Sequence, residues 1–276
     1  MDLAFIIGFV LLVALLLYGM GFSTLGLFFD PQSIAITLGG VIFATVMSYP
    51  LTIWAKFPKY VSHVFKKNPY DPKKFIELIV DYSQEARRKG LLSLEERVMA
   101  EEDFFLKKSL MLIVDAIDPA KVREMLETEL ANLEDRHNQG AMLFEKLAGF
   151  GPAYGMIGTL IGLIKMLGNL DLNSADGATN LTKGMATALI TTFYGSILAN
   201  SIFMPIANKL RDNHSKEMLC KELIMEGVIA IQAGDNPKHI EEKLSAYLEE
   251  KKRSLEGGEG GGEEGGKKGK KKKGEE

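Results

Sequence analysis

The sequence predicts an all-α membrane protein with four transmembrane helices and a helical cytoplasmic domain. Apolar residues make up 46% of the 276 residues, and they gather in four blocks that contain no Asp or Glu. A mean hydropathy of +0.04 together with 25% charged residues fits a membrane protein better than an ordinary soluble one. About 20 helical residues at about 1.5 Å each cross a bilayer core of roughly 30 Å, so each block is long enough to span. No run of alternating strand residues competes with this interpretation.

The charges that flank the blocks predict the orientation of the chain. The first block, residues 3–20, has no basic leader and no evident cleavage site, so we interpret it as a retained anchor. Residues 21–32 contain no Lys or Arg, whereas Lys56 and Lys59 follow the second block almost at once. Basic residues near span ends favour the cytoplasmic side. We therefore expect both termini and the long middle region inside, and two short loops outside.

The middle and C-terminal regions carry helix-start signals. Asp71-Pro72, Asp118-Pro119 and Asn236-Pro237 each place a capping side chain before a proline suited to the first helical position. The helix that follows Asp71 is expected to end near Gly90, and the residues from Ser93 to Glu96 match a capping box that opens another helix. These signals predict a helical region rather than an irregular one.

Long helices are expected to extend the third and fourth spans into the cytoplasm. Leu126, Leu130 and Leu133 share one helical face ahead of the third span, and a helical pattern runs from the fourth span to Gly234. The glycine-rich charged tail is expected to be disordered. The predicted organisation is a first transmembrane helix (1–20), a short external loop (21–32), a second transmembrane helix (33–55), a cytoplasmic helical domain (56–146), a third transmembrane helix (147–168), a short external loop (169–183), a fourth transmembrane helix (184–207), cytoplasmic C-terminal helices (208–254) and the tail (255–276).

Enzyme and metal signatures are not found in the sequence. The glycines of 149–155 lack the spacing of a dinucleotide loop, and no strand precedes them. The histidines show no metal-ligand spacing, so each is interpreted as a surface or helix-packing residue. They are His63, His137, His214 and His239. The single cysteine, Cys220, excludes a disulfide framework and predicts a buried, inert thiol. We therefore expect no enzyme activity, no metal and no cofactor.

Small residues and hydroxyls dominate the last two spans. Close helix packing through a glycine stripe is expected in the third span, with a comparable stripe in the fourth. The stripe residues are Gly151, Gly155, Gly158, Gly162 and Gly195. The hydroxyls of Thr159, Thr191 and Thr192 have two interpretations, since each could bond its own helix or face a wet cavity. If these spans line an ion path, the titratable group must come from another chain.

Several motifs resemble one family. Residues 152–162 read Pro-Ala-Tyr-Gly-Met-Ile-Gly-Thr-Leu-Ile-Gly, residues 188–195 read Ala-Leu-Ile-Thr-Thr-Phe-Tyr-Gly, and residues 204–207 read Met-Pro-Ile-Ala. They look like the last two spans of the MotA/PomA family of flagellar motor stator subunits. The segment 87–95, Arg-Arg-Lys-Gly-Leu-Leu-Ser-Leu-Glu, resembles the family's cytoplasmic segment that meets the rotor. The likeness covers residues 1 to about 250.

The resemblance implies a motor in the bacterial inner membrane. Family members form a ring of five MotA-type subunits around two MotB-type subunits, and each MotB-type helix carries the aspartate that binds the ion. The ring is thought to turn as protons or sodium ions pass, and its cytoplasmic domain drives the rotor protein FliG. The implied partners are therefore a MotB/PomB-like B subunit of the stator, FliG, further copies of this chain and the lipid bilayer. No nucleic-acid partner is expected.

The resemblance also assigns roles to residues. Pro152 and Pro205 match prolines that couple conformation to ion occupancy, because a missing amide proton permits a local bend. Arg87 and Glu95 match the rotor interface. The residues expected to face the ion path and the partner helix are Tyr154, Thr159, Thr191 and Thr192. Sodium-type members carry threonine at the position of Thr159, where many proton-type members have alanine, so the sequence favours sodium.

Two other functions remain open from the sequence. A ring-type energiser of the TolQ/ExbB kind, which pulls on an envelope partner, would share the stoichiometry but has three spans and a different cytoplasmic arrangement. A membrane scaffold without ion flux is the second alternative. Four spans and the segment 87–95 favour the motor.

Overall fold

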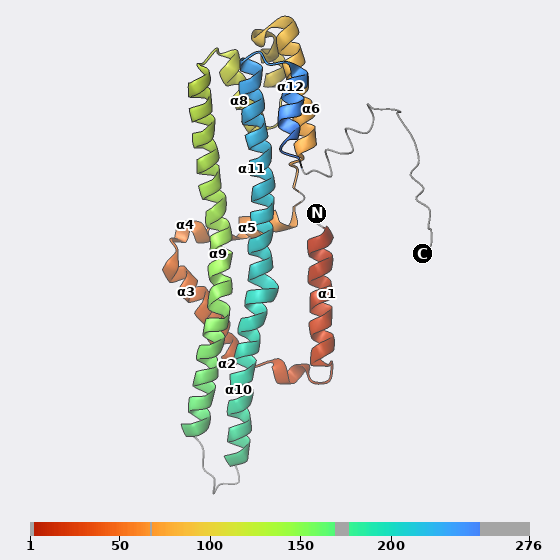
Figure 1. Ribbon diagram of the computed structural model, residues 1–276. Coiled ribbons are helices and arrows are strands. Elements are labelled where there is room, and N and C mark those ends of the chain that lie inside the picture. Colours follow the sequence, from red (N-terminus) through yellow and green to blue (C-terminus); the bar gives the residue numbers. More distant parts are fainter. Residues whose placement is uncertain (1–2, 67, 169–176, 249–276) are drawn as a thin grey trace, which may run out of the picture. The chain divides into compact units, whose positions relative to one another are not determined.

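The computed structural model describes residues 3–66, 68–168 and 177–248, and all elements in these ranges are helical (Figure 1). The chain divides into two units. One comprises residues Met1–Tyr70 and Glu127–Met218, and the other comprises Asp71–Leu126 and Leu219–Glu276. We call them the membrane unit and the helical domain. The tail expected at 255–276 and part of the loop expected at 169–183 lie outside the described residues.

The membrane unit holds the predicted spans. Four helices are long and apolar enough to cross a membrane: Leu3–Met20, Pro31–Ser48, and segments of Pro119–Gly168 and Leu181–Gln232. The elements of this unit are α1 (Leu3–Met20), the 3-10 turn η1 (Leu25–Phe28), α2 (Pro31–Ile34), the π-turn η2 (Ala35–Gly39), α3 (Gly40–Ser48), α4 (Leu51–Trp54), α5 (Phe57–Phe65), most of α9 (Pro119–Gly168), α10 (Gly177–Ile197), the π-turn η4 (Leu198–Phe203) and the first half of α11 (Met204–Gln232).

The second span differs from the helix expected over 33–55. It begins at Pro31, where the Asp30 carboxylate caps the helix by accepting a hydrogen bond of 3.2 Å from Ser33 N. It ends at Ser48, and Tyr49 is extended with φ −135° and ψ 143°. The physical reason is Pro50, since the residue before a proline is disfavoured in the α region. The following residues form the separate short helices α4 and α5.

The two prolines expected to couple conformation to the ion lie inside long helices. Pro152 is an interior residue of α9. Pro205 directly follows the π-turn η4 and is the second residue of α11. A proline within a helix leaves the carbonyl four residues earlier without its helical donor. Both sites therefore hold a local irregularity within the backbone of a predicted span.

An aromatic cluster fixes α5 against α9 in the membrane unit. The Trp54 ring stacks on Phe57 with 5.8 Å between centroids, and Phe57 stacks on Phe144 at 5.2 Å. Gly140 of α9 lies against Tyr60, since a methyl group on Gly140 would stand 2.9 Å from the Tyr60 ring. These contacts pack α5 against α9 at Gly140 and Phe144.

The helical domain confirms the predicted helix starts. Its elements are α6 (Pro72–Lys89), η3 (Leu91–Leu94), α7 (Glu95–Met99), α8 (Phe104–Val114), the start of α9, the second half of α11 and α12 (Pro237–Ser245). Asp71, Asp118 and Asn236 each accept a backbone hydrogen bond at the start of a helix. Helix α6 ends at Gly90, whose φ of +88° favours glycine.

The capping box expected at Ser93 does not form. A 3-10 turn occupies residues 91–94, and the Ser93 hydroxyl donates back to Gly90 O at 2.7 Å. Leu94 is the N-cap of α7 and makes no side-chain cap. The Ser93 hydroxyl is therefore used to close the turn after α6. Cys220 is buried in this unit, as predicted.

Candidate functional site

The glycines of the third span face the fourth span of the same chain, where α9 and α10 lie side by side (Figure 1). A methyl group on Gly151 would stand 2.7 Å from Gly195 O, and one on Gly162 would stand 2.9 Å from Ala188 N. On Gly155 it would stand 3.2 Å from the Thr192 Cα. Nine in ten real Cβ contacts are longer than 3.4 Å. The glycine stripe is therefore occupied by α10, and we call this contact the α9–α10 seam.

The threonines of the seam fall into two environments. Thr159 Oγ1 lies 2.5 Å from Thr192 Oγ1 and 3.0 Å from Ala188 O, and Thr192 is exposed. Thr191 is fully buried, and its hydroxyl lies 2.9 Å from Ala188 O and 3.1 Å from Thr187 O. Of these three threonines, the Thr159–Thr192 pair is therefore the one placed where an incoming ion or helix could reach a hydroxyl.

An exposed strip runs along one side of the seam. On α9 it begins at exposed Pro152, continues at exposed Met156 and ends at half-buried Thr159, positions that share one helical face. On α10 it continues through Thr192 and Ser196, both exposed. We call these five residues the threonine strip. Residues 147–168 and 184–207 contain no Asp or Glu, so the chain supplies hydroxyls but no carboxylate along it.

Tyr154 and Tyr194 lie away from the strip and tie other segments to the seam. The Tyr154 ring lies against Gly40 of the second span, where any side chain at residue 40 would collide with it. The Tyr194 hydroxyl donates to Phe28 O, and Asp30 N donates to Tyr194 Oη at 3.4 Å. No role for Tyr194 was predicted from the sequence. A tyrosine inside an apolar span was the available signal, because its hydroxyl needs a partner when buried.

The turn between α6 and α7 displays the other predicted pair. Arg87 and Glu95 are both exposed, and Gly90 with its positive φ lies between them. Both residues belong to the helical domain. Neither has an ion-pair partner among the described residues. They are therefore available to a partner.

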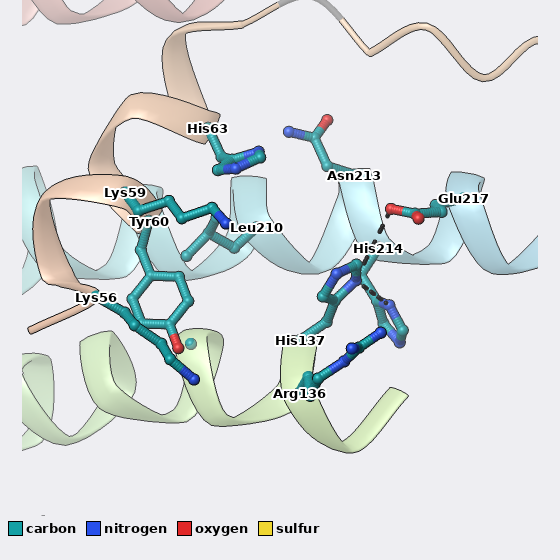
Figure 2. A pocket seen from close by; sticks show the side chains of 11 residues that line it. Lys56, Lys59, Tyr60, His63, Arg136, His137, Leu210, Asn213, His214 and Glu217 are labelled. Atoms are coloured by element: carbon teal, nitrogen blue, oxygen red, sulfur yellow. Dashed lines mark hydrogen bonds and ion pairs between the residues drawn. The ribbon is translucent and has the colours of Figure 1, made fainter. Parts of the chain in front are cut away.

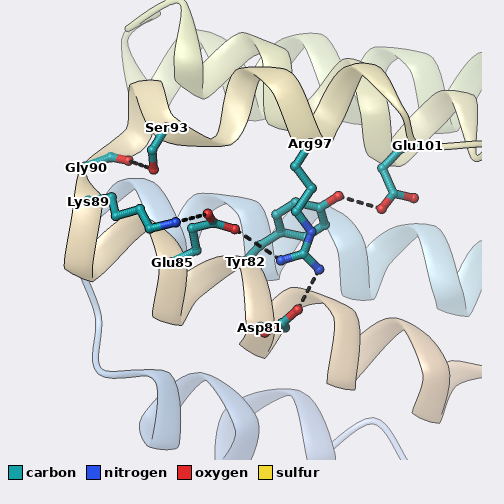
Figure 3. A network of polar contacts seen from close by, with 8 residues as sticks. All are labelled: Asp81, Tyr82, Glu85, Lys89, Gly90, Ser93, Arg97 and Glu101. Carbon is teal, nitrogen blue, oxygen red and sulfur yellow. Dashed lines mark hydrogen bonds and ion pairs between the residues drawn. The ribbon is translucent and has the colours of Figure 1, made fainter.

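A polar network holds this turn in shape (Figure 3). The Arg97 guanidinium lies 4.3 Å from the centre of the Tyr82 ring and pairs with Asp81 and, at 3.2 Å, with Glu85. The buried Tyr82 hydroxyl donates to Glu101. These contacts join α6 to α7 and to the residues that follow α7. Arg97 was not predicted from the sequence, because its partners are 12 and 16 residues away.

The network changes the acidity of its members. Burial, and then the hydrogen bond and charge of Glu101, raise the pKa of Tyr82. Hydrogen bonds from Lys89 and Arg97 lower the pKa of the Glu85 carboxyl. Both groups therefore stay in their ordinary ionisation states at neutral pH. The network is a stable support for the turn near pH 7.

Comparison with known proteins identifies the family. Residues 97–223 match the family model described as the MotA/TolQ/ExbB proton channel family. A motility protein A from Borreliella burgdorferi is 41% identical over 256 residues, which cover 92% of this chain and 96% of that protein. The chain belongs to the MotA/TolQ/ExbB family. The predicted resemblance is thereby confirmed.

A further relative and a solved structure also match nearly the whole chain. The chemotaxis protein PomA of Vibrio alginolyticus is 40% identical, over 93% of this chain and 99% of that protein. The flagellar MotAB stator complex from Bacillus subtilis contains a chain that matches with a TM-score of 0.82 and 30% identity, covering 94% of this chain and 99% of that one. Membership in the MotA/TolQ/ExbB family and four apolar helices make this a multi-pass inner-membrane protein.

The family match and the two candidate surfaces overlap only in part. The matched residues 97–223 include the threonine strip and both Pro152 and Pro205. They do not include Arg87 or Glu95, which lie before the match begins. The strip therefore lies within the stretch that the family model matches, whereas Arg87 and Glu95 of the α6–α7 turn lie before it.

Proposed function

We propose that this chain is a stator component of a bacterial flagellar motor, which converts an ion motive force into torque on the rotor. The observation that carries the proposal is an exposed hydroxyl strip on spans without any carboxylate. Relatives named motility protein A and PomA, and the likeness to a MotAB stator complex, support it. The ion-binding carboxylate then belongs to a helix of a MotB-type partner.

The threonine strip is proposed as the surface that this partner helix meets. Thr159 and Thr192 present a hydroxyl pair there, and Met156 and Ser196 flank it. A hydroxyl can replace part of the hydration shell of a sodium ion. Thr191 is buried and the ring of Tyr154 packs against Gly40, so both are proposed to support the packing of the seam without contacting the ion.

Pro152 and Pro205 are proposed to couple ion occupancy to a change in helix shape. Each removes one backbone hydrogen bond from a long helix, and a helix bends most easily at such a point. The π-turn before Pro205 adds a second irregularity to the fourth span. π-turns occur frequently at functional sites in helices.

The assembly is proposed to contain five copies of this chain and two copies of the MotB-type partner, with both termini of this chain in the cytoplasm. Arg87 and Glu95 on the α6–α7 turn are proposed to contact the rotor protein FliG. Exposed charges act there by complementarity with the opposite surface, so the contact weakens as ionic strength rises. The exposure of both residues supports this role.

Sodium is proposed as the transported ion on the basis of the Thr159–Thr192 pair. One elementary charge that crosses 100 mV releases about 2.3 kcal/mol, so two ions per step supply several times the thermal energy.

The decisive experiment measures the swimming speed of a complemented strain as sodium is varied at fixed pH, with and without a proton uncoupler. Swimming that persists with uncoupler and stops without sodium is expected. The reverse pattern would assign protons.

Single substitutions test the strip. Thr159→Ala and Pro152→Ala are expected to reduce swimming and, for Thr159→Ala, to change its sodium dependence. Thr45→Ala is the matched control, because Thr45 is buried in the second span and its hydroxyl donates to Val41 O of its own helix. Unchanged motility and ion dependence in both strip variants would refute the assignment of these residues.

The TolQ/ExbB type of energiser is the second candidate, because the matching family model covers those proteins too. Four apolar helices favour the motor over that candidate. Co-purification distinguishes the two candidate functions. A stator component is expected to capture a MotB-type partner from a flagellated cell. Deletion of this chain is then expected to stop swimming. A membrane scaffold would leave ion flux and swimming unchanged.

A further inference from the structure

A cavity of about 490 Å³ lies within the membrane unit where α5, α9 and α11 meet (Figure 2). Its size falls within the range of roughly 300–1,000 Å³ that is typical of small-ligand sites. The stacking of Phe57 on Phe144 and the contact between Gly140 and Tyr60 hold α5 against α9 beside it. The cavity is lined by Lys56, Lys59, Tyr60, His63, Arg136, His137, Gly140, Leu210, Asn213, His214 and Glu217.

Positive charge dominates this lining. Lys56, Lys59 and Arg136 come from two different segments of the chain, and none of them forms an ion pair within the described part of the chain. Glu217 is the one lining carboxylate, and it accepts a hydrogen bond of 3.1 Å from the Tyr70 hydroxyl. Three basic side chains therefore face a single carboxylate, which already accepts a hydrogen bond. Such an excess attracts an anion.

Three histidines that are far apart in the sequence also meet here. His137 Nδ1 lies 3.2 Å from His214 Nδ1 and 3.8 Å from Glu217 Oε2, and His63 lines the cavity from α5 (Figure 2). The sequence predicts that each is a surface or helix-packing residue. In the structure, α9 and α11 bring His137 and His214 into direct contact, which is a packing role that the sequence spacing does not reveal. Imidazole N–H groups are additional donors for an anion.

The position of the cavity along the spans points to the membrane boundary. Trp54 ends α4 directly before the basic helix α5, and tryptophan is enriched at the level of lipid headgroups. The basic flank of a span marks its cytoplasmic side. Basic pockets between transmembrane helices on that side bind phosphate-bearing lipid headgroups. The favoured anion is therefore one that the inner leaflet itself supplies.

We propose that this cavity binds a phosphate group, contributed by the headgroup of an anionic phospholipid, through Lys56, Lys59 and Arg136. The arginine fork can donate two parallel hydrogen bonds to phosphate oxygens, and the lysines add compact charges. A soluble phosphate ester offers the same chemistry and is the alternative source. The site is formed by this chain alone and does not depend on the motor function.

The histidines make the binding of the anion depend on pH. Burial is the main cause that lowers the pKa of both His63 and His137, and neighbouring basic groups lower it further, while the charge of Glu217 opposes the shift at both. Both are therefore neutral near pH 7 and gain charge on acidification, which strengthens the attraction for an anion. The ionisable groups around the cavity and its histidines are Lys56 before α5, Lys59, Tyr60 and His63 on α5, Lys66 and Tyr70 after it, Arg136 and His137 on α9, and His214 and Glu217 on α11.

The test uses the complex of the full chain with its MotB-type partner, delipidated in a neutral detergent. A short-chain phosphatidylglycerol is titrated, and the lipids bound per copy of this chain are counted by native mass spectrometry at pH 6 and pH 8. Saturable binding, tighter at pH 6, is expected.

The K59Q/R136Q variant should bind about ten-fold more weakly or worse, since each charge-assisted hydrogen bond is worth about that much. The control K121Q/K238Q removes two exposed cations that do not line the cavity and should bind like the wild type.

Glu217→Gln tests the same site in the opposite direction. Glutamine can still accept the Tyr70 hydrogen bond but carries no charge, so phosphatidylglycerol should bind about two- to five-fold more tightly. A misfolded variant could not produce this gain. Inorganic phosphate and glycerol 3-phosphate that saturate the site without added lipid would assign the soluble source and overturn the lipid assignment. Equal binding by wild type and K59Q/R136Q, or an equal loss in K121Q/K238Q, would overturn the proposal.

Discussion

Tyr82 concentrates several interactions at one position of the α6–α7 turn. Its ring is fully buried under the Arg97 guanidinium, and its hydroxyl donates to the Glu101 carboxylate. A hydrogen bond to a charged group contributes about 1.5–3 kcal/mol, and more is lost when a buried partner stays unsatisfied. Tyr82 is therefore one of the main supports of the surface that carries Arg87 and Glu95, together with the ion pairs of Arg97.

Tyr82→Phe is expected to loosen this turn by about 1–2 kcal/mol, because Glu101 loses its donor while the aromatic packing is kept. Amide hydrogen exchange of peptides from α6 and α7 in the purified complex should become faster by about ten-fold, as about 1.4 kcal/mol corresponds to that factor. Tyr247→Phe is the matched control, since Tyr247 is 37% exposed. Equal exchange in Tyr82→Phe and wild type would show that the hydroxyl does not support the turn.

His137 gives the membrane unit a pH-dependent local stability. Burial lowers its pKa in the folded chain below the ordinary value of about 6.5. The neutral form is thus favoured in the folded state. This contribution to stability is complete above about pH 6.5, the unfolded value, and is lost as the pH falls from there through the lower pKa of the folded chain.

Acidification from pH 7.5 to 5.5 in phosphate-free buffer is therefore expected to increase local opening around residues 130–140. Hydrogen exchange, corrected for the intrinsic pH dependence of the exchange rate, measures it. His137→Gln should flatten this dependence, whereas His239→Gln on α12 should not, because His239 is exposed and does not line the cavity. An identical slope in His137→Gln would argue against the role of this imidazole.

Local sequence signals predicted local residues well and distant partners poorly. The caps at Asp71, Asp118 and Asn236 were predictable because each bond joins neighbouring residues. Arg97 was not, because its ring and carboxylate partners meet only after α6 and α7 pack. The contact between His137 and His214 likewise spans 77 residues and needs two helices in register.

At the scale of elements, the α9–α10 seam depends on the absence of side chains. Gly151 and Gly195 face each other so closely that a methyl group on either meets the backbone of the other. Small residues allow this approach, and tight packing is a main source of helix association in a bilayer. The seam also positions the Thr159–Thr192 pair, which forms across it.

Gly195→Ala is therefore expected to force the two helices apart, at a cost of about 1–3 kcal/mol for overpacking. The yield of folded complex and the swimming speed should both fall. Gly149→Ala on α9 is the matched control, because nothing lies within 4 Å of its added methyl group. Normal yield and swimming in Gly195→Ala would mean that the seam opens without penalty.

The number and order of the spans were predictable from hydropathy, whereas their internal geometry was not. Blocks of apolar residues directly reflect the bilayer thickness. The end of the second span at Ser48 could be anticipated from Pro50, but the π-turns at 35–39 and 198–203 could not. A π-turn is set by packing against neighbouring helices and leaves no composition signal.

At the scale of the whole molecule, we propose that this chain supplies hydroxyls along the ion path and that its partner supplies the carboxylate. The chain alone should therefore not conduct cations. Liposomes that contain this chain alone are expected to show no cation flux above empty liposomes, measured with pH-sensitive and sodium-sensitive dyes. Liposomes with the chain and its MotB-type partner should conduct once the complex is active. Selective cation flux through the chain alone would mean that the acid is not needed or lies within this chain.

The π-turn at Leu198–Phe203 has a consequence for how the length of the fourth span can vary. Such a turn is equivalent to one extra residue inserted into an α-helix, so removing a residue there restores regular winding without rotating the flanking turns. A deletion elsewhere in the span would turn everything beyond it by about 100°, as 3.6 residues make one turn. Homologous chains that are one residue shorter in this span should therefore carry their gap at 198–203, and deleting Asn200 should be tolerated where deleting Leu189 is not.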